Sequence, residues 1–127
     1  MNGLIILEEW LDLILNGRKT WEIRNRNAKI RGQIALIQKG SGLIIGVCDL
    51  IDVKGPLSVD ELEKSIDKHQ VPIGFLRNAL HYKKTYAWVL TNARRLRNPK
   101  PYKHPLGAVI WVKLPYGSID DLENNKS

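Results

Sequence analysis

Residues 16–24 read Asn-Gly-Arg-Lys-Thr-Trp-Glu-Ile-Arg, and they place a helix stop directly before a strongly charged strand. In a strand that begins at Thr20, successive side chains point to opposite faces. Trp21 and Ile23 are therefore predicted to face the core, while the charged residues between and after them face the other way. We predict a polar cleft lined by three charged side chains: Lys19, Glu22 and Arg24. The spacing alone leaves open a second interpretation, a surface strand whose charges are simply solvated.

Turn residues and apolar runs on both sides of this stretch predict a mixed α+β domain. Strands are expected at 3–7, from residue 20, and at 33–38, 43–53, 85–91 and 108–114. Helices are expected at 8–15, 58–69 and 73–80, and Ser58 and Glu61 form a capping box at the start of the second. Gly46 is expected to mark a bulge or a barrel corner. We therefore predict a small β-barrel of about six strands with two or three flanking helices over residues 1–114, followed by a flexible polar tail at 115–127.

Charge is distributed unevenly along the 127 residues, which carry a formal net charge of +7. No Asp or Glu occurs between Lys68 and Ile119, where aromatic residues are interleaved with Lys and Arg. Such a surface suits a polyanion such as nucleic acid, although lysines that only confer solubility are the alternative. The residues expected to contact RNA lie in this half and on the glycine-rich turn before it: Lys39, Ser41, Tyr86, Arg94, Arg95, Arg97, Lys100, Lys103 and His104.

Cysteine usage and hydropathy indicate a cytoplasmic protein without a membrane segment. The single cysteine, Cys48, lies in an apolar run and is expected to be buried and unreactive. No apolar run approaches the roughly 18 residues that a membrane span needs. The N-terminus lacks the basic region of a signal peptide, and a reducing cytoplasm fits a lone thiol. The sequence leaves the oligomeric state open.

Several short motifs together resemble the ASCH domain family, whose members have a PUA-like β-barrel fold. The most specific is the pattern Gly-x-Lys-x-x-Glu-x-Arg at residues 17–24, which follows the helix motif at 10–15. Weaker support comes from Ile-Gly-Val at 45–47, Tyr-Ala-Trp-Val-Leu at 86–90 and Gly-Ala-Val-Ile-Trp at 107–111. The resemblance covers residues 3–114 and fits a small, stand-alone, bacterial-type member.

The resemblance implies work on RNA in a cleft that holds Lys19, Glu22 and Arg24. Some small bacterial members are ribonucleases that act on single-stranded RNA, which implies Mg²⁺ or Mn²⁺ as an activator and no tightly bound cofactor. We assign no metal ligand, because the chain has no His/Asp cluster at metal-ligand spacing. Another branch hydrolyses the amide of N4-acetylcytidine with a lysine and a threonine three positions later. Glu22 occupies that threonine position here, which argues against the amidohydrolase activity.

Two assignments of catalytic roles are open for RNA cleavage. In the first, Glu22 is the general base, and Lys19 and Arg24 stabilise the charge on phosphorus. Two flanking cations stabilise the carboxylate and make it a weak base, so in the second Glu22 orients its neighbours and Lys19 is the base. The competing hypothesis is a recognition module without catalysis, whose cleft holds a phosphate or a flipped base. His69, near the end of a predicted helix, is expected to be structural or solvated.

Overall fold

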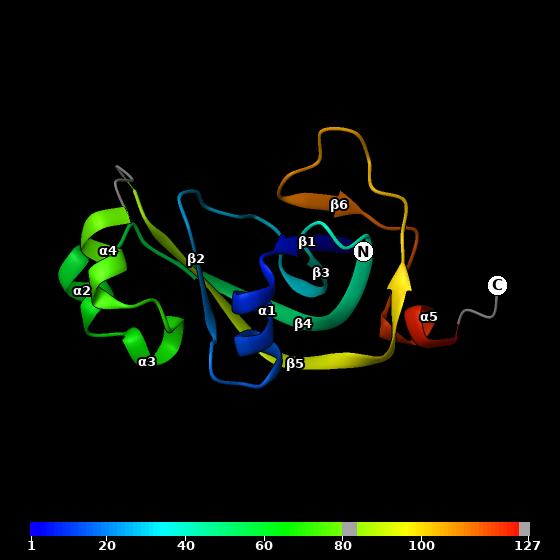
Figure 1. Cartoon of the computed structure of the whole chain (residues 1–127), viewed down its shortest axis with the longest axis horizontal. Helices are drawn as coiled ribbons and strands as arrows, with labels where there is room; N and C mark the ends of the chain where they lie inside the picture. The colour runs from blue at the N-terminus through cyan, green and yellow to red at the C-terminus, as the bar shows by residue number, and fades with distance from the viewer. Residues whose placement is uncertain (80–83, 125–127) are drawn as a thin grey trace.

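Six strands form one curled sheet in the computed structural model, which describes residues 1–79 and 84–124. They are β1 (Asn2–Ile6), β2 (Trp21–Arg24), β3 (Gly32–Gln38), β4 (Leu43–Lys54), β5 (Tyr86–Pro101) and β6 (Trp111–Lys113). Their order across the sheet is β2-β5-β4-β3-β1-β6, with β1 parallel to β3 and the other neighbours antiparallel. The sheet curls into a half-barrel (Figure 1), which confirms the predicted α+β class.

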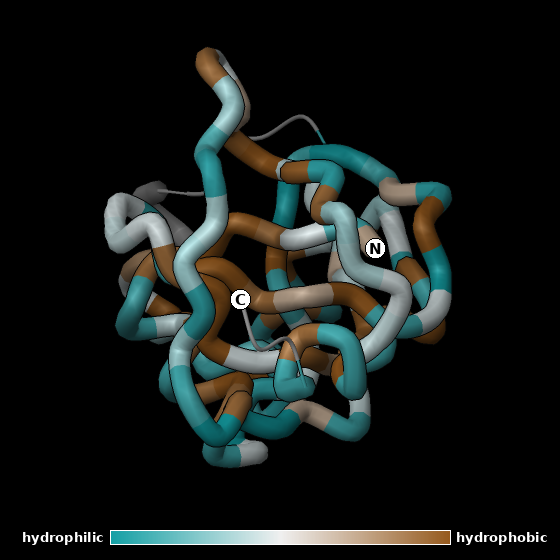
Figure 2. The backbone as a smooth tube through the Cα atoms, turned by 90° about the vertical axis from the view of Figure 1, so that its right-hand side faces the viewer, coloured by the Kyte–Doolittle hydropathy of each residue, from teal (hydrophilic) through white to brown (hydrophobic). Residues whose placement is uncertain are grey.

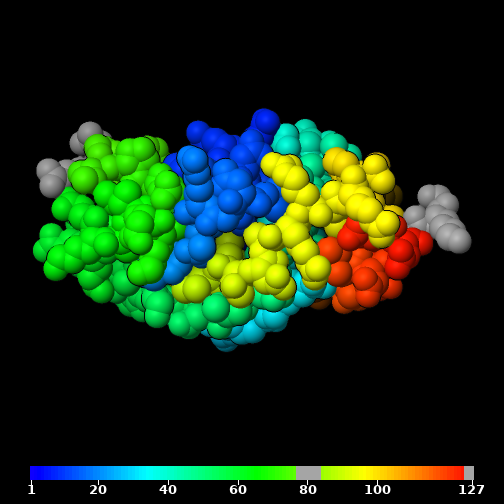
Figure 3. All heavy atoms as spheres, turned by 90° about the horizontal axis from the view of Figure 1, so that it is seen from below, coloured from blue at the N-terminus to red at the C-terminus, as the bar shows by residue number. Residues whose placement is uncertain are grey.

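Five short helices among the described residues flank this sheet, where the sequence predicted two or three. They are α1 (Glu8–Leu15), α2 (Val59–Glu63), α3 (Ile66–His69), α4 (Ile73–Ala79) and α5 (Ile119–Asn124). Helices α2, α3 and α4 gather at one end of the molecule and α5 lies at the other (Figure 1). From below, α1 lies between that helical cluster and the yellow part of β5, against which α5 packs (Figure 3).

Alternating side chains of the central strands fill two separate cores, one on each side of the sheet. On β1, Leu4 and Ile6 join the first core, while Ile5 between them joins the second. Helix α1 covers the first core, and α5 covers the second. Cys48 lies in the first core, where burial raises the pKa of its thiol to about 12. This confirms the prediction of a buried cysteine and favours an unreactive one.

Strand β5 runs to Pro101, well beyond the end predicted at residue 91. Asn92 adopts a left-handed backbone with φ 56°, and the β4–β5 register shifts at three places, so the strand bends and continues. One shift lies at Gly46, where a Cβ atom would come 2.5 Å from the carbonyl oxygen of Arg94. This confirms the predicted bulge and explains why a glycine is required at that close approach.

Two other predicted elements are shorter than expected. The helix at 58–69 is divided into α2 and α3 at Ser65, where the backbone leaves the helical conformation and the hydroxyl donates a hydrogen bond to the Glu61 carbonyl. The strand at 108–114 is reduced to β6, because residues 102–110 form a raised loop whose hydrophobic tip stands at the top of Figure 2. Helix α4 confirms the third predicted helix up to Ala79, and its predicted last residue, Leu80, lies outside the described residues.

The prediction of a flexible tail from residue 115 is wrong for residues 119–124. They form α5, whose Ile119 and Leu122 are buried in the second core. The predicted tail was judged by its polar composition, but two apolar residues three positions apart suffice to dock one face of a helix. The packed structure therefore extends past the boundary predicted at residue 114.

Candidate functional site

Lys19 is a buried cation held between α1 and β2. The chain leaves α1 through Gly17, whose φ is +84°, and the Lys19 amide then donates to the Leu13 carbonyl. Its side chain extends over the Trp10 ring, with Nζ 4.9 Å from the ring centroid. Nζ donates a 2.6 Å hydrogen bond to the backbone carbonyl of His69, and the residue is only 2% exposed. Lys19 therefore links β2 to the α2–α4 cluster.

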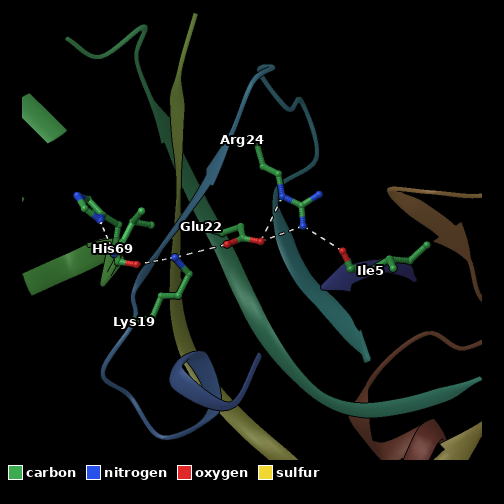
Figure 4. Close-up of polar contacts among 6 residues, drawn as sticks. Ile5, Lys19, Glu22, Arg24 and His69 are labelled. Atoms are coloured by element: carbon green, nitrogen blue, oxygen red, sulfur yellow. Dashed lines mark hydrogen bonds and ion pairs between the residues drawn. The ribbon is translucent and has the colours of Figure 1, made fainter. Parts of the chain in front are cut away.

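Glu22 lies between two cations and is itself 5% exposed. Its Oε1 is 3.5 Å from Lys19 Nζ, and its Oε2 accepts hydrogen bonds from Arg24 Nε at 3.2 Å and Nη2 at 2.9 Å. The Arg24 Nη2 also donates to the carbonyl of Ile5 at 3.0 Å. Figure 4 shows the resulting row of contacts from His69 through the three charged residues to Ile5. We call Lys19, Glu22 and Arg24 the ion cluster.

The tryptophan pair behind Arg24 fixes the guanidinium in place. Arg24 Cζ lies 5.4 Å from the Trp88 ring centroid, and Trp88 stacks on Trp111 with centroids 5.6 Å apart. The Trp88 indole N–H donates to the carbonyl of Arg26, so this fully buried ring has no unpaired polar atom. Arg24 is therefore held by its charge partner, a carbonyl and an aromatic face, which makes it a rigid element of the site.

The predicted orientation of β2 is wrong in one respect: Glu22 is the most buried residue of the strand. Trp21 is half-buried and covered by Lys68, whose Nζ lies 5.3 Å from its ring centroid. Ile23 is also half-buried and packs on the small core of the α2–α4 cluster. The charged face turns inward because Lys19 and Arg24 compensate the carboxylate, which lowers the cost of burying it. The sequence pattern showed the alternation correctly but not which face was covered.

The ion cluster forms the floor of a cleft of about 320 Å³. The cleft is lined by Ile5, Leu7, Trp10, Lys19, Glu22, Ile23, Arg24, Lys39, Val71, Phe75 and Val109. Three of these, Leu7, Phe75 and Val109, are exposed apolar residues, and they come from three distant segments. The sequence did not identify them, because an isolated exposed apolar residue is common and carries no signal of its own. The result is a charged floor beneath apolar walls.

Lys39 and His104 mark a second hollow that adjoins the cleft. This second hollow, of about 360 Å³, is lined by Ile5, Lys39, Gly40, Gly42, Tyr102, His104, Ala108 and Val109. Lys39 lines both spaces, as does Val109. Ser41 instead stabilises the turn, since its hydroxyl donates to the Gln38 carbonyl and accepts from the Leu43 amide. Of the residues predicted to bind RNA, Lys39 and His104 are thus the two beside the cleft.

The other predicted RNA contacts lie away from the cleft along and beyond β5. Tyr86 is half-buried and packs on the first core. Two of the arginines have acidic partners: Arg95 is 3.2 Å from Asp12, and Arg97 is 2.9 Å from Glu123. Arg94 and Lys103 are exposed, and Lys100 lies over the Tyr116 ring. The structure therefore does not gather the predicted RNA contacts at one place. These arginines and lysines form a separate basic stretch along and beyond β5.

Burial also perturbs the two titratable groups at the junction of β2 and α3. Removal from water lowers the pKa of Lys19, an effect that Glu22 opposes and Arg24 reinforces. Burial likewise lowers the pKa of His69, whose Nδ1 accepts from the Val71 amide and whose Nε2 lies 2.6 Å from the Leu62 carbonyl. Because that carbonyl can only accept, Nε2 carries the proton and the ring is neutral. His69 is thus structural, as expected.

The cleft does not have the donor set of a resident divalent cation. Both Glu22 oxygens already contact cations, whereas Mg²⁺ and Mn²⁺ need several oxygen ligands. Across residues 1–79 and 84–124, no three His, Cys, Asp or Glu side chains are grouped as a metal site. In the same part of the chain, no helix is long and apolar enough to cross a membrane.

Comparisons with known proteins agree on one family. The model of the ASCH domain family matches residues 4–100. The crystal structure of an ASCH protein from Zymomonas mobilis is 18% identical, covers 77% of this chain and 71% of that one, and has a TM-score of 0.65. The crystal structure of its tyrosine-to-phenylalanine variant is 19% identical, covers 79% of this chain and 74% of that one, and has a TM-score of 0.65. The crystal structure of its serine-to-alanine variant is 18% identical, covers 88% of this chain and 87% of that one, and has a TM-score of 0.69. At this identity the similarity shows the fold, which is PUA-like as predicted. No curated protein sequence matches the chain.

Proposed function

The chain belongs to the ASCH domain family, and from that premise we propose that it binds single-stranded RNA and cleaves it in the cleft above the ion cluster. The observation that carries the proposal is the cleft's construction, a fixed floor of two cations and one anion under exposed apolar walls. The net charge of +7 supports a polyanionic partner.

The walls suit a nucleobase taken out of its stack. Phe75 and Val109 offer apolar surface to a planar ring, and single-stranded RNA is recognised through such unstacked bases. Below them, the Glu22 carboxylate is a hydrogen-bond acceptor, which suits the polar edge of a base. Lys39 is exposed on the cleft margin, where it can neutralise a phosphate.

For cleavage we assign the base to Lys19 rather than Glu22. Both Glu22 oxygens are already held by cations, so Glu22 orients the cluster, while burial lowers the pKa of Lys19 towards the range of a working base. Lys19 rests as an ammonium in the ion cluster, and its lowered pKa makes the neutral amine more accessible. That amine takes the proton of the ribose 2′-hydroxyl, whose oxygen then forms a bond to phosphorus. The bond from phosphorus to the 5′ oxygen breaks, a water molecule protonates the leaving oxygen, and the hydroxide that remains takes the proton back from Lys19. Arg24, together with Lys39 at the cleft margin, stabilises the charge on the phosphorane.

A non-catalytic recognition module is the second candidate, and one observation favours it. Lys19 and Glu22 are almost completely buried, and each already has its partners within the protein. A group so satisfied suits a rigid binding surface at least as well as proton transfer. In that case the cleft would recognise a base without any turnover.

The test is incubation of purified protein with end-labelled single-stranded RNA, with Mg²⁺, with Mn²⁺ and with EDTA. We expect cleavage in all three, because both oxygens of Glu22 already contact Lys19 and Arg24, and the described residues of the cleft lining include no second carboxylate to offer a divalent metal ion. Lys19→Met keeps the apolar stem and removes the amine, so it should abolish cleavage. Lys54→Met, the same change at an exposed lysine that does not line the cleft, should leave it intact. Equal cleavage by both variants would refute the catalytic assignment, and binding without cleavage would establish the second candidate. N4-acetylcytidine in the same assay should give no cytidine.

A further inference from the structure

The second hollow has no role in the function proposed so far, although it opens beside the cleft. The two spaces share Ile5, Lys39 and Val109, so they are neighbours, and Lys39 lies at their boundary. At about 360 Å³ the second hollow is as large as the cleft and lies in the range of small-molecule sites. Its lining contains no acidic residue, so nothing in its wall repels a phosphate.

Two aromatic rings in the second hollow are fixed by hydrogen bonds. His104 Nε2 lies 2.9 Å from the Ala108 carbonyl, which can only accept, so Nε2 carries the proton. His104 Nδ1 therefore accepts the hydroxyl proton of Tyr102 at 2.7 Å. The two rings pack edge to face, with centroids 5.7 Å apart. A pre-ordered aromatic wall loses little conformational freedom when a planar ligand stacks on it.

The boundary between the two spaces has the chemistry of a phosphate contact. Lys39 is exposed there, and it begins the turn whose Gly40 and Gly42 both have positive φ and line the second hollow. The glycines leave the backbone uncovered by side chains, which allows a ligand to approach it closely. A phosphate at Lys39 would then have one hollow on each side.

Resting on the proposed function, we infer that the second hollow is a nucleotide subsite and that the protein holds two consecutive nucleotides of an RNA strand. One base occupies the cleft above the ion cluster, the linking phosphate lies at Lys39, and the neighbouring base stacks against Tyr102 in the second hollow. The minimal ligand is therefore a dinucleotide, which separates this site from one that recognises a single modified or flipped base.

Calorimetric titration with two short probes tests this inference. The probes are uridine 3′-monophosphate and the dinucleotide UpU, both carrying 2′-fluoro groups so that cleavage through the 2′-hydroxyl is impossible. Stacking of one base on an aromatic side chain corresponds to about fivefold or more in affinity. We therefore expect the dinucleotide to bind at least fivefold more tightly than the mononucleotide.

Three variants locate the gain. Tyr102→Ala removes the aromatic wall, and Ala108→Trp fills the second hollow. Each variant should bind the dinucleotide only as tightly as the mononucleotide, and each should bind the mononucleotide as the wild type does. Tyr116→Ala, the matched change at a half-buried tyrosine outside the lining, should preserve the gain. Equal affinities of the wild type for both probes, or a gain that survives Ala108→Trp, would overturn the second subsite while leaving the proposed function standing. Failure of both probes and of a longer single-stranded RNA to bind would overturn the proposed function as well.

Discussion

Glu22→Gln removes one charge from the ion cluster and should destabilise the fold strongly. The carboxylate lies 3.5 Å from Lys19 Nζ and 2.9 Å from Arg24 Nη2. At an effective dielectric constant of about 20, each of these attractions is worth about 5 kcal/mol, and the desolvation of the carboxylate offsets several kcal/mol of their sum. The glutamine keeps the size and an acceptor oxygen but leaves two cations facing each other, one of them 2% exposed. We expect a loss of about 3–5 kcal/mol in the free energy of unfolding, as for other broken buried pairs.

Equilibrium unfolding in urea, followed by tryptophan fluorescence, measures this loss. Glu9→Gln removes a charge from an exposed position in the first turn of α1 and should cost less than about 1 kcal/mol. The double variant Lys19→Met/Glu22→Gln should lose at least about 1.5 kcal/mol less unfolding free energy than the two single variants lose together, because it no longer contains an unpaired buried ammonium. A Glu22→Gln protein within about 1 kcal/mol of the wild type, with no coupling to Lys19, would refute the reasoning.

Four further predictions concern His69, Gly46 and the arginines of β5. His69→Ala should cost about 2–4 kcal/mol, because it leaves the Leu62 carbonyl and the Val71 amide unpaired in a buried site, and urea unfolding will show whether it does. Burial lowers the pKa of His69, so the folded state resists protonation of the ring. The stability that the neutral ring contributes is complete above the unfolded pKa near 6.5 and is lost as the pH falls below that value. His69→Ala should therefore flatten the dependence of stability on pH between about pH 6.5 and 5, and an unchanged slope would contradict this. Gly46→Ala should destabilise the fold by about 1–3 kcal/mol, because the new Cβ meets the Arg94 carbonyl. Gly74→Ala, in open space on α4, should be neutral or slightly stabilising. Equal thermal unfolding midpoints of the two variants would show that the backbone moves apart at Gly46 without cost. We expect RNA longer than the cleft to continue over the arginines of β5. Arg94→Ala should then lower the slope of log affinity against log salt by about 0.7, and Arg97→Ala should lower it less because Glu123 already neutralises that cation. The reverse order in a salt titration would show that Arg94 does not contact RNA.

The grouping of Lys19, Glu22 and Arg24 was predictable because it depends on local spacing. Three charged residues within six positions, after a glycine that ends a helix, cannot lie far apart whichever way the strand faces. The capping box at Ser58 and the bulge at Gly46 were predictable for the same reason, since each follows from backbone geometry at one site. Local rules therefore located the ion cluster and most of the strands.

Contacts between distant segments were not predictable from one sequence. The arginines at 95 and 97 looked free, but their partners Asp12 and Glu123 lie 83 and 26 positions away. The orientation of β2 depends on the His69 carbonyl, which is fifty positions from Lys19. The cleft walls at Phe75 and Val109 likewise meet only in the folded chain. Periodicity reports which side chains share a face, but only the tertiary fold determines what covers that face.

The indole N–H signals of the tryptophans offer the most direct test that RNA occupies the cleft. Trp10 lines the cleft beside Lys19, whereas Trp21 lies outside the lining under Lys68. In a nuclear magnetic resonance titration with single-stranded RNA carrying 2′-fluoro groups, we expect the Trp10 signal to shift in proportion to binding and the Trp21 signal to stay in place. A Trp21 signal that moves while Trp10 is unaffected would place the RNA elsewhere and contradict the assignment of the cleft.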